Sequence, residues 1–248
     1  MFRGAGTALN VATVLLGSGV GVALGGRLPE RTRSTVTDAL GLVTLVIGAL
    51  GVAEGLGSAA WEAAVGPSAT LLIVLGALLL GGIAGSLLRL EERLEGLGGR
   101  LQARLQRGGT EGRVRFVEGF VSASLLFCIG PLTVLGSLSD GLGRGIEQLA
   151  LKSTLDGFAA LAFASSLGWG VAASALSVAV VQGTLTTAGA LLGGLLPEAE
   201  VAALTATGGV LLLGVALRLL GLKQVAVGDL LPALVAAPAL TALVSVIR

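Results

Sequence analysis

Two neighbouring segments read FVEGFVSASLLFCIGPLTVLGS (residues 116–137) and IEQLALKSTLDGFAALAFASS (residues 146–166). Each is about as long as the ~20 apolar residues that a helix needs to cross the hydrocarbon core of a bilayer. The first contains Gly130-Pro131, which disturbs a helix, and the second contains Lys152 and Asp156, whose charges are costly in lipid. The pattern predicts membrane-spanning helices that enclose a polar centre.

The composition of the whole chain is that of a membrane protein. Of its 248 residues, 12% are charged, about half of the ~25% that is usual in soluble domains. The mean hydropathy is +0.94, and the clustered charges leave long uncharged runs. The net charge of +1 gives no indication of a nucleic-acid partner. The expected surroundings are therefore a lipid bilayer.

The residue types that are missing restrict the chemistry. The chain has no His, and Cys128 is its single cysteine. A Ser-His-Asp triad, a His-ligated metal, and a disulfide or cysteine-pair redox motif within one chain are therefore excluded. Lys152-Ser153-Thr154 lacks the glycines of a phosphate-binding loop. We expect no enzymatic activity, no catalytic residue, no metal and no cofactor.

Eight apolar segments have about the length needed to span a bilayer. They cover residues 4–28, 35–53, 67–90, 116–137, 146–166, 169–195, 201–220 and 225–247. The expected fold is all-α, a polytopic transmembrane helical bundle of about eight spans that forms one domain over residues 1–248. Trp61 and Trp169 lie near the ends of predicted spans, where tryptophans anchor helices at the interface.

Lysine and arginine are distributed unevenly among the connections between the predicted spans. With the N-terminus outside, twelve fall in inside connections and three in outside ones, while Lys152 lies within a span. Short connections rich in positive charge stay on the cytoplasmic side. We therefore expect both termini to lie outside.

The longest connection, residues 91–115, is predicted to be a cytoplasmic amphipathic hairpin. Leucines recur there at three- and four-residue steps with Arg and Glu between them, a helical pattern with one apolar face. Its seven arginines, counted from Arg89, are largely offset by glutamates, so the hairpin is no simple polybasic patch. Either a solvated hairpin or a surface that docks on lipid headgroups or a partner is consistent with this pattern.

Shifting the chain by 168 residues aligns residues 21–45 with residues 189–213 at ten identical positions, among them the motif Gly-Gly-x-Leu-Pro-Glu. With the topology above, the matched spans cross the membrane in opposite directions. This predicts an inverted repeat of spans one to three against spans six to eight, with halves at residues 1–90 and 169–248. Such repeats surround midplane sites in secondary transporters. The alternative is coincidence in a Gly- and Leu-rich sequence.

Lys152 and Asp156 are four residues apart and therefore share one face of a helix. A lone charge at such a depth costs at least ~2.5 kcal/mol, so each must pair or face water. The pair either binds a solute or ion, or only pins neighbouring helices. Asn10 and Gln182 are the carboxamides well inside spans, where they line the same solute pathway or anchor helices to one another.

Gly130-Pro131 predicts a broken helix whose freed backbone groups line a cavity, or else a plain kink. Two acidic residues, Glu118 and Asp140, fall near the predicted membrane edges and are secondary candidates for the pathway. Their simpler roles are a helix cap or a solvated charge, and Asp140-Gly141 most simply makes a turn.

Small residues recur every four positions in several spans, as in Gly17, Gly21 and Gly25, in Gly81 and Gly85, and in Gly189 and Gly193. Glycines at this spacing let two helix backbones approach closely. They are expected to serve packing within the chain, or a homo-oligomer contact through the same faces.

Several motifs together resemble a bacterial inner-membrane family of unknown function, which contains the YqgA- and YdfK-type membrane proteins. They are Gly6-Thr7-x-x-Asn10, the run from Glu118 to Pro131, Leu135-Gly136-Ser137, Asp140-Gly141-Leu142, Lys152-Ser153-x-x-Asp156-Gly157, Gln182-Gly183 and Leu230-Leu231-Pro232-Ala233. The resemblance covers nearly the whole chain. It implies a multi-pass protein of the bacterial plasma membrane and supplies no substrate or mechanism.

The leading hypothesis is a secondary transporter or channel for a small solute or ion, with Asp156 coordinating or relaying and Lys152 as its counter-charge. The alternative is a non-transporting scaffold or regulatory protein that acts through the Arg-rich hairpin. A membrane enzyme ranks third, because without His or paired thiols it would have to rely on carboxylates or on Ser-Lys chemistry, for which Lys152-Ser153 alone is weak evidence.

Overall fold

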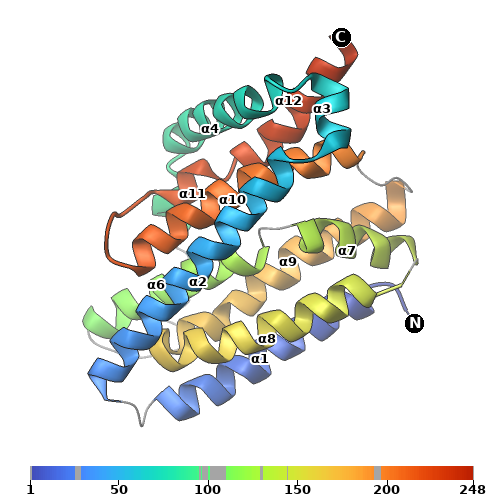
Figure 1. Ribbon diagram of the computed structural model, residues 1–248. Helices are drawn as coiled ribbons and strands as arrows, with labels where there is room; N and C mark the ends of the chain where they lie inside the picture. The colour runs from blue at the N-terminus through green and yellow to red at the C-terminus, as the bar shows by residue number, and fades with distance from the viewer. Residues whose placement is uncertain are drawn as a thin grey trace. The chain divides into compact units, whose positions relative to one another are not determined.

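A computed structural model describes residues 2–25, 29–94, 96, 100, 110–128, 131–143, 145–192 and 197–247. Over these ranges the protein consists of helices and connections without any strand (Figure 1), which confirms the all-α prediction. The helices are α1 (Ala5–Gly25), α2 (Glu30–Leu56), α3 (Ala59–Val65), α4 (Ala69–Leu87), α6 (Thr110–Cys128), α7 (Pro131–Leu142), α8 (Glu147–Leu167), α9 (Trp169–Leu192), α10 (Glu198–Leu219), α11 (Val227–Leu230) and α12 (Ala233–Ile247).

Six segments among the described residues are long and apolar enough to cross a membrane. They are Ala5–Gly25, Ser34–Leu56, Ala69–Leu87, Trp169–Leu191, Glu198–Leu219 and Val227–Ile247. α8 has a comparable length of 21 residues but contains the charged pair. The protein is thus a polytopic helical bundle, while the number of eight spans stays a prediction.

The predicted fourth span, residues 116–137, is divided into two helices. α6 ends at Cys128, α7 begins at Pro131, and the helical parts on either side of the break differ in direction by 76°. A proline fits the first position of a helix, where its missing N–H costs nothing, but not the interior. Gly130 lies outside the described residues. The Gly130-Pro131 motif therefore marks a broken helix, as one reading of the sequence predicted.

The predicted hairpin at residues 91–115 lies mostly outside the described residues. Its last six residues, from Thr110 to Arg115, form the first turns of α6. This span therefore begins earlier than its apolar pattern indicated.

The helices group into two compact units. Unit 1 comprises Met1–Leu40 with Glu95–Leu195, and unit 2 comprises Gly41–Leu94 with Leu196–Arg248. Each unit contains helices from both halves of the predicted repeat, namely α1 and α9 in unit 1 and α4, α10 and α12 in unit 2. The residues of α2 are divided between the two.

In unit 1, α1 lies directly along α8. A Cβ atom on any of three α1 glycines would collide with a backbone carbonyl oxygen of α8. The pairs are Gly17 with Gly157, Gly21 with Leu161 and Gly25 with Ser165. Because the contact positions move toward the C-terminus in both helices by the same four-residue steps, α1 and α8 run parallel. These predicted small-residue positions are thus used within the chain, and homo-oligomerisation through this face stays untested.

The two halves of the broken helix pack on α9, which runs back beside α1 and α8 (Figure 1). Gly170 at the start of α9 packs on the backbone of Phe116 in α6. Near the other end of α9, Gly189 packs on Leu138 in α7. Together α6 and α7 therefore cover α9 along most of its length.

The described residues of unit 2 include a small apolar core and a partly buried ion pair. Trp61 is fully buried in that core, together with side chains of α4, α10 and α12, so its predicted place as an interfacial anchor was wrong. Arg218 of α10 forms an ion pair with Glu91, whose other carboxylate oxygen accepts the N–H of Gly228 at 2.5 Å. The backbone N–H of Glu91 donates to Asp229 at 2.9 Å.

Both copies of the Gly-Gly-x-Leu-Pro-Glu motif precede a helix in the same register. Glu30 is the first residue of α2 and Glu198 is the first residue of α10. Gly41 packs on Leu220 and Gly209 packs on the backbone of Val52. A shift of 168 residues takes Gly41 to Gly209 and Val52 to Leu220, so each contact corresponds to the other. Both contacts join α2 to α10, and these two helices run antiparallel. The inverted repeat itself stays a prediction.

Candidate functional site

Lys152 and Asp156 lie one turn apart on α8, near the middle of the helix. The Lys152 Nζ atom donates to Asp156 Oδ2 at 2.6 Å, and each residue exposes 7% of its surface. Asp156 is ~14 Å along the helix axis from its first residue, Glu147. The charged pair is therefore deep within unit 1 and packed closely, with little access from outside.

Asn10 of α1 is hydrogen bonded to the charged pair. Its Nδ2 atom donates to the same Asp156 Oδ2 atom at 2.9 Å, and the residue is fully buried. The close parallel packing of α1 on α8 makes this approach feasible, and Thr13 one turn further on lies against Gly157. Among the described residues nothing hydrogen bonds to Asp156 Oδ1. One oxygen of the carboxylate is thus held by protein donors and the other is available.

Gln182 lies on α9, close to the position of Asn10 along the neighbouring helix α1. One turn beyond it, Thr186 exchanges a hydrogen bond of 3.1 Å with Thr7, which precedes Asn10 by one turn. Because α1 and α9 run in opposite directions, Gln182 and Asn10 occupy neighbouring layers of the same packed region. The structure thus brings Asn10, Lys152 and Asp156 into direct contact and places Gln182 nearby without a direct bond.

Several buried polar atoms around this region have no hydrogen-bond partner among the described residues. They are Asn10 Oδ1, both Gln182 side-chain atoms, Ser18 Oγ and Ser137 Oγ. A buried polar group without a partner costs about 1–3 kcal/mol. Two amides that are both incompletely bonded, close to a charged pair, are the arrangement expected of a site that accepts a polar guest.

The broken helix reaches the charged pair. Gly119 of α6 lies against Leu167 and Gly136 of α7 lies against Leu149, and the charged pair lies between these two positions of α8. α6 ends at Cys128, and α7 begins three residues later, at Pro131. The break between α6 and α7 therefore flanks the charged pair, although Gly130 itself lies outside the described residues.

Asp140 acts as a helix cap and not as part of the polar centre. It lies inside α7 and is 2% exposed, so the prediction of a turn at Asp140-Gly141 was wrong. Its two carboxylate oxygens accept the backbone N–H groups of Gly4 and Gly6, each at 3.0 Å. Gly141 is needed because a Cβ atom there would collide with the carbonyl oxygen of Thr186. The chain turns later, at Gly143.

Glu118, the other secondary candidate, is half-buried on α6. It is an acidic residue on the same helix as Cys128, ten positions earlier.

Replacing Asp140 by alanine is expected to destabilise the protein by about 1–2 kcal/mol, because the first N–H groups of α1 lose their charged acceptor. Thermal unfolding in detergent, followed by size-exclusion chromatography, measures the change. Asp38→Ala is the matched control, since Asp38 is an exposed acidic residue on α2. Equal melting temperatures for the two variants would contradict the capping role.

A helix cap was one of the roles predicted for Asp140, but the sequence did not identify the partners in two polar contacts that join distant parts of the chain. These are the Asp140 cap of α1 and the Glu91–Arg218 ion pair, in which 134 and 127 residues separate the partners. Glu91 is the first residue of the predicted hairpin, and Arg218 is one of the twelve basic residues assigned to inside connections. A single sequence gives no signal for either pairing, because each residue looks locally like a surface charge.

Comparison with known proteins gives a consistent result over nearly the full chain. A family model described as "Protein of unknown function (DUF554)" matches residues 5–242. The chain is 33% identical over 238 residues to the uncharacterized protein YqgA of Escherichia coli (strain K12), covering 96% of each protein. It is 27% identical over 233 residues to the uncharacterized membrane protein YdfK of Bacillus subtilis (strain 168), covering 94% of this chain and 93% of YdfK. No solved structure matches. These matches confirm the resemblance carried by the sequence motifs.

Proposed function

Since the chain belongs to the DUF554 family of membrane proteins of unknown function, its activity has to be inferred from its own residues, and we propose that it is a secondary transporter or channel for a small solute or ion. The observation that supports this proposal most is the buried Lys152–Asp156 pair, to which Asn10 donates beside incompletely bonded amide atoms. Apolar residues would pack helices at lower cost than an ion pair, which is often replaced without loss of stability. Retaining charge at this depth therefore favours a functional role.

Each residue of the site has a role in this proposal. Asp156 coordinates a cation or relays a proton through its available Oδ1 atom. Lys152 neutralises the carboxylate when no guest is bound, so a guest cation competes with its ammonium group. The amides of Asn10 and Gln182 supply polar lining. In the described conformation the pair is closely packed, so transport requires a movement that opens a path to it.

The backbone supports the same proposal. Broken helices beside a polar site are frequent in transporters, because freed backbone groups can bind solute where they line a cavity. The break between α6 and α7 flanks the charged pair in this way. The antiparallel, symmetry-related contacts of α2 and α10 are those that an inverted repeat requires. A location in the bacterial inner membrane with both termini outside is part of the proposal.

Reconstitution into proteoliposomes tests the function. Rapid jumps of H⁺, Na⁺, K⁺ and Cl⁻ concentration over a solid-supported membrane report any charge movement through the protein. We expect a protein-dependent current for at least one of these ions. Gln182→Leu keeps the size of the side chain but removes its polar atoms. We expect it to reduce that current about tenfold, which corresponds to the loss of roughly 1.4 kcal/mol of stabilisation by one polar lining group.

Ser177→Ala is the matched control on the same helix, because Ser177 bonds to Ser124 and not to the charged pair. Currents equal to those of empty liposomes for all four ions would refute ion transport. The scaffold hypothesis, which rests on the Arg-rich hairpin, would then become the leading one.

A further inference from the structure

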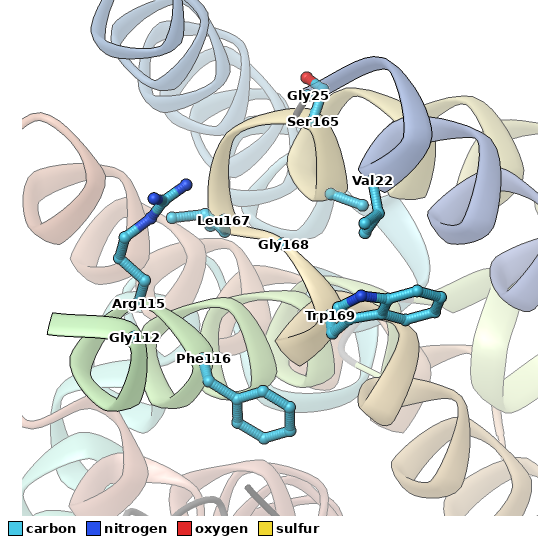
Figure 2. Close-up of a pocket in the computed structure, with 10 residues that line it drawn as sticks. Val22, Gly25, Gly112, Arg115, Phe116, Ser165, Leu167, Gly168 and Trp169 are labelled. Atoms are coloured by element: carbon cyan, nitrogen blue, oxygen red, sulfur yellow. The ribbon is translucent and has the colours of Figure 1, made fainter. Parts of the chain in front are cut away.

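A second polar feature of unit 1 lies at the end of the helices, well away from the charged pair. It is a pocket of about 340 Å³ at the turn between the end of α8 and the start of α9 (Figure 2). Its lining includes Arg115 of α6, Ser165 of α8, and Gly168 and Trp169 at the turn. Figure 2 shows the Arg115 side chain and the Trp169 indole on either side of the Gly168 turn.

The pocket presents positively polarised donors. Arg115 uses one guanidinium nitrogen to donate to the Ser166 carbonyl at 2.5 Å, and its other donors have no partner among the described residues. Trp169, which lines the pocket, is the first residue of α9. The first backbone N–H groups of a helix lack intrahelical partners, and the helix dipole is positive there. The Ser165 hydroxyl already donates to Ala162 at 2.7 Å, so it can only accept.

Glycines keep the pocket open. A Cβ atom on Gly112 or on Gly168 would meet no heavy atom within 4 Å. Gly168 also has a φ of 77°, which favours glycine at the turn between α8 and α9. Among the described residues, no side chain therefore lies within 4 Å of these two glycine positions beside Arg115.

Helix ends meet at the pocket, and helix ends are where a membrane interface is expected. The end of α1, the beginning of α6 and the α8–α9 turn all contribute to its lining. Trp169 is 48% exposed there, as expected for an interfacial tryptophan. Val22 and Leu167 add apolar lining next to the polar groups.

From this geometry we propose that the pocket binds a phosphate group, held by the Arg115 guanidinium and the first N–H groups of α9. Arginine binds phosphate through parallel charge-assisted hydrogen bonds, and helix N-termini bind anions through backbone N–H groups. Phospholipid headgroups place such phosphates at this depth in the membrane. The site is independent of the transport proposal, because it shares none of the residues Asn10, Lys152, Asp156 and Gln182.

Binding is tested on the delipidated protein in a detergent without phosphate groups. The probes are inorganic phosphate and short-chain dihexanoyl phosphatidylglycerol, and the readout is the rise in melting temperature as each probe is titrated. We expect the melting temperature of the wild-type protein to rise, and Arg115→Gln to weaken the apparent affinity at least tenfold. A response to the lipid alone identifies a headgroup as the source, and an equal response to inorganic phosphate identifies a free phosphate.

Two further variants keep the test decisive. Gly112→Leu fills the open space beside Arg115 without removing charge and is expected to weaken binding as strongly as Arg115→Gln. Arg113→Gln removes an exposed arginine of the same helix that does not line the pocket, and is expected to bind like the wild type. No response to either probe, or an equal loss in Arg113→Gln, would overturn the proposal.

Discussion

A double variant, Lys152→Gln with Asp156→Asn, is expected to regain most of the stability that Asp156→Asn loses alone, yet to show no flux. Asp156→Asn leaves the Lys152 ammonium buried at 7% exposure without its carboxylate. Removing one partner of a buried ion pair costs about 3–5 kcal/mol, whereas replacing both partners is often neutral. Stability and transport should therefore separate in the double variant.

This separation distinguishes a functional pair from a structural one. If the pair only pins α8 to its neighbours, a double variant that restores stability also restores everything that the pair contributed. If Asp156 coordinates or relays, a neutral amide cannot replace it, and flux stays lost at normal protein levels. The melting temperature and the solid-supported membrane current, measured on the same preparations, decide between these outcomes.

Thr154→Ala serves as the control on α8. Thr154 is exposed, and its hydroxyl bonds only to the Ala150 carbonyl one turn earlier, at 3.1 Å. We expect wild-type stability and wild-type current from this variant. A double variant with full current would remove Asp156 from the mechanism, whatever its stability.

The helical, membrane-spanning architecture could be predicted because it depends on local quantities. A run of ~20 apolar residues has few alternatives in water or lipid, so the span positions follow from composition and length. The helix break at Pro131 was also readable, since proline cannot continue a helix without losing a hydrogen bond. The pairing of Lys152 with Asp156 follows from their spacing alone.

The contacts between distant segments could not be predicted in this way. Asn10 looked like any buried amide, and only the packing of α1 on α8 shows that it donates to Asp156. Asp140 looked like a turn residue, because its acceptor role depends on N–H groups 134 residues away. Trp61 looked interfacial, but a short helix, α3, places it in the core of unit 2.

The packing of α1 on α8 predicts opposite effects for two substitutions only two residues apart. Gly21→Ala is expected to destabilise the protein by about 3 kcal/mol, because overpacking a close contact costs ~1–3 kcal/mol and the added carbon collides with the Leu161 carbonyl. The added Cβ atom would also lie 2.9 Å from the Cβ atom of Ala164. Neither neighbour can move without separating the helices.

Gly19→Ala is the matched control and is expected to stabilise the protein by up to about 1 kcal/mol. A Cβ atom on Gly19 meets no heavy atom within 4 Å, so only the better helix propensity of alanine remains. Thermal unfolding of both variants in one detergent measures the contrast. Because the same helix contact holds Asn10 on Asp156, we further expect Gly21→Ala to lose current and Gly19→Ala to keep it. Equal stability of the two variants would mean that α1 and α8 are not in close contact, and the site built on that contact would have to be abandoned.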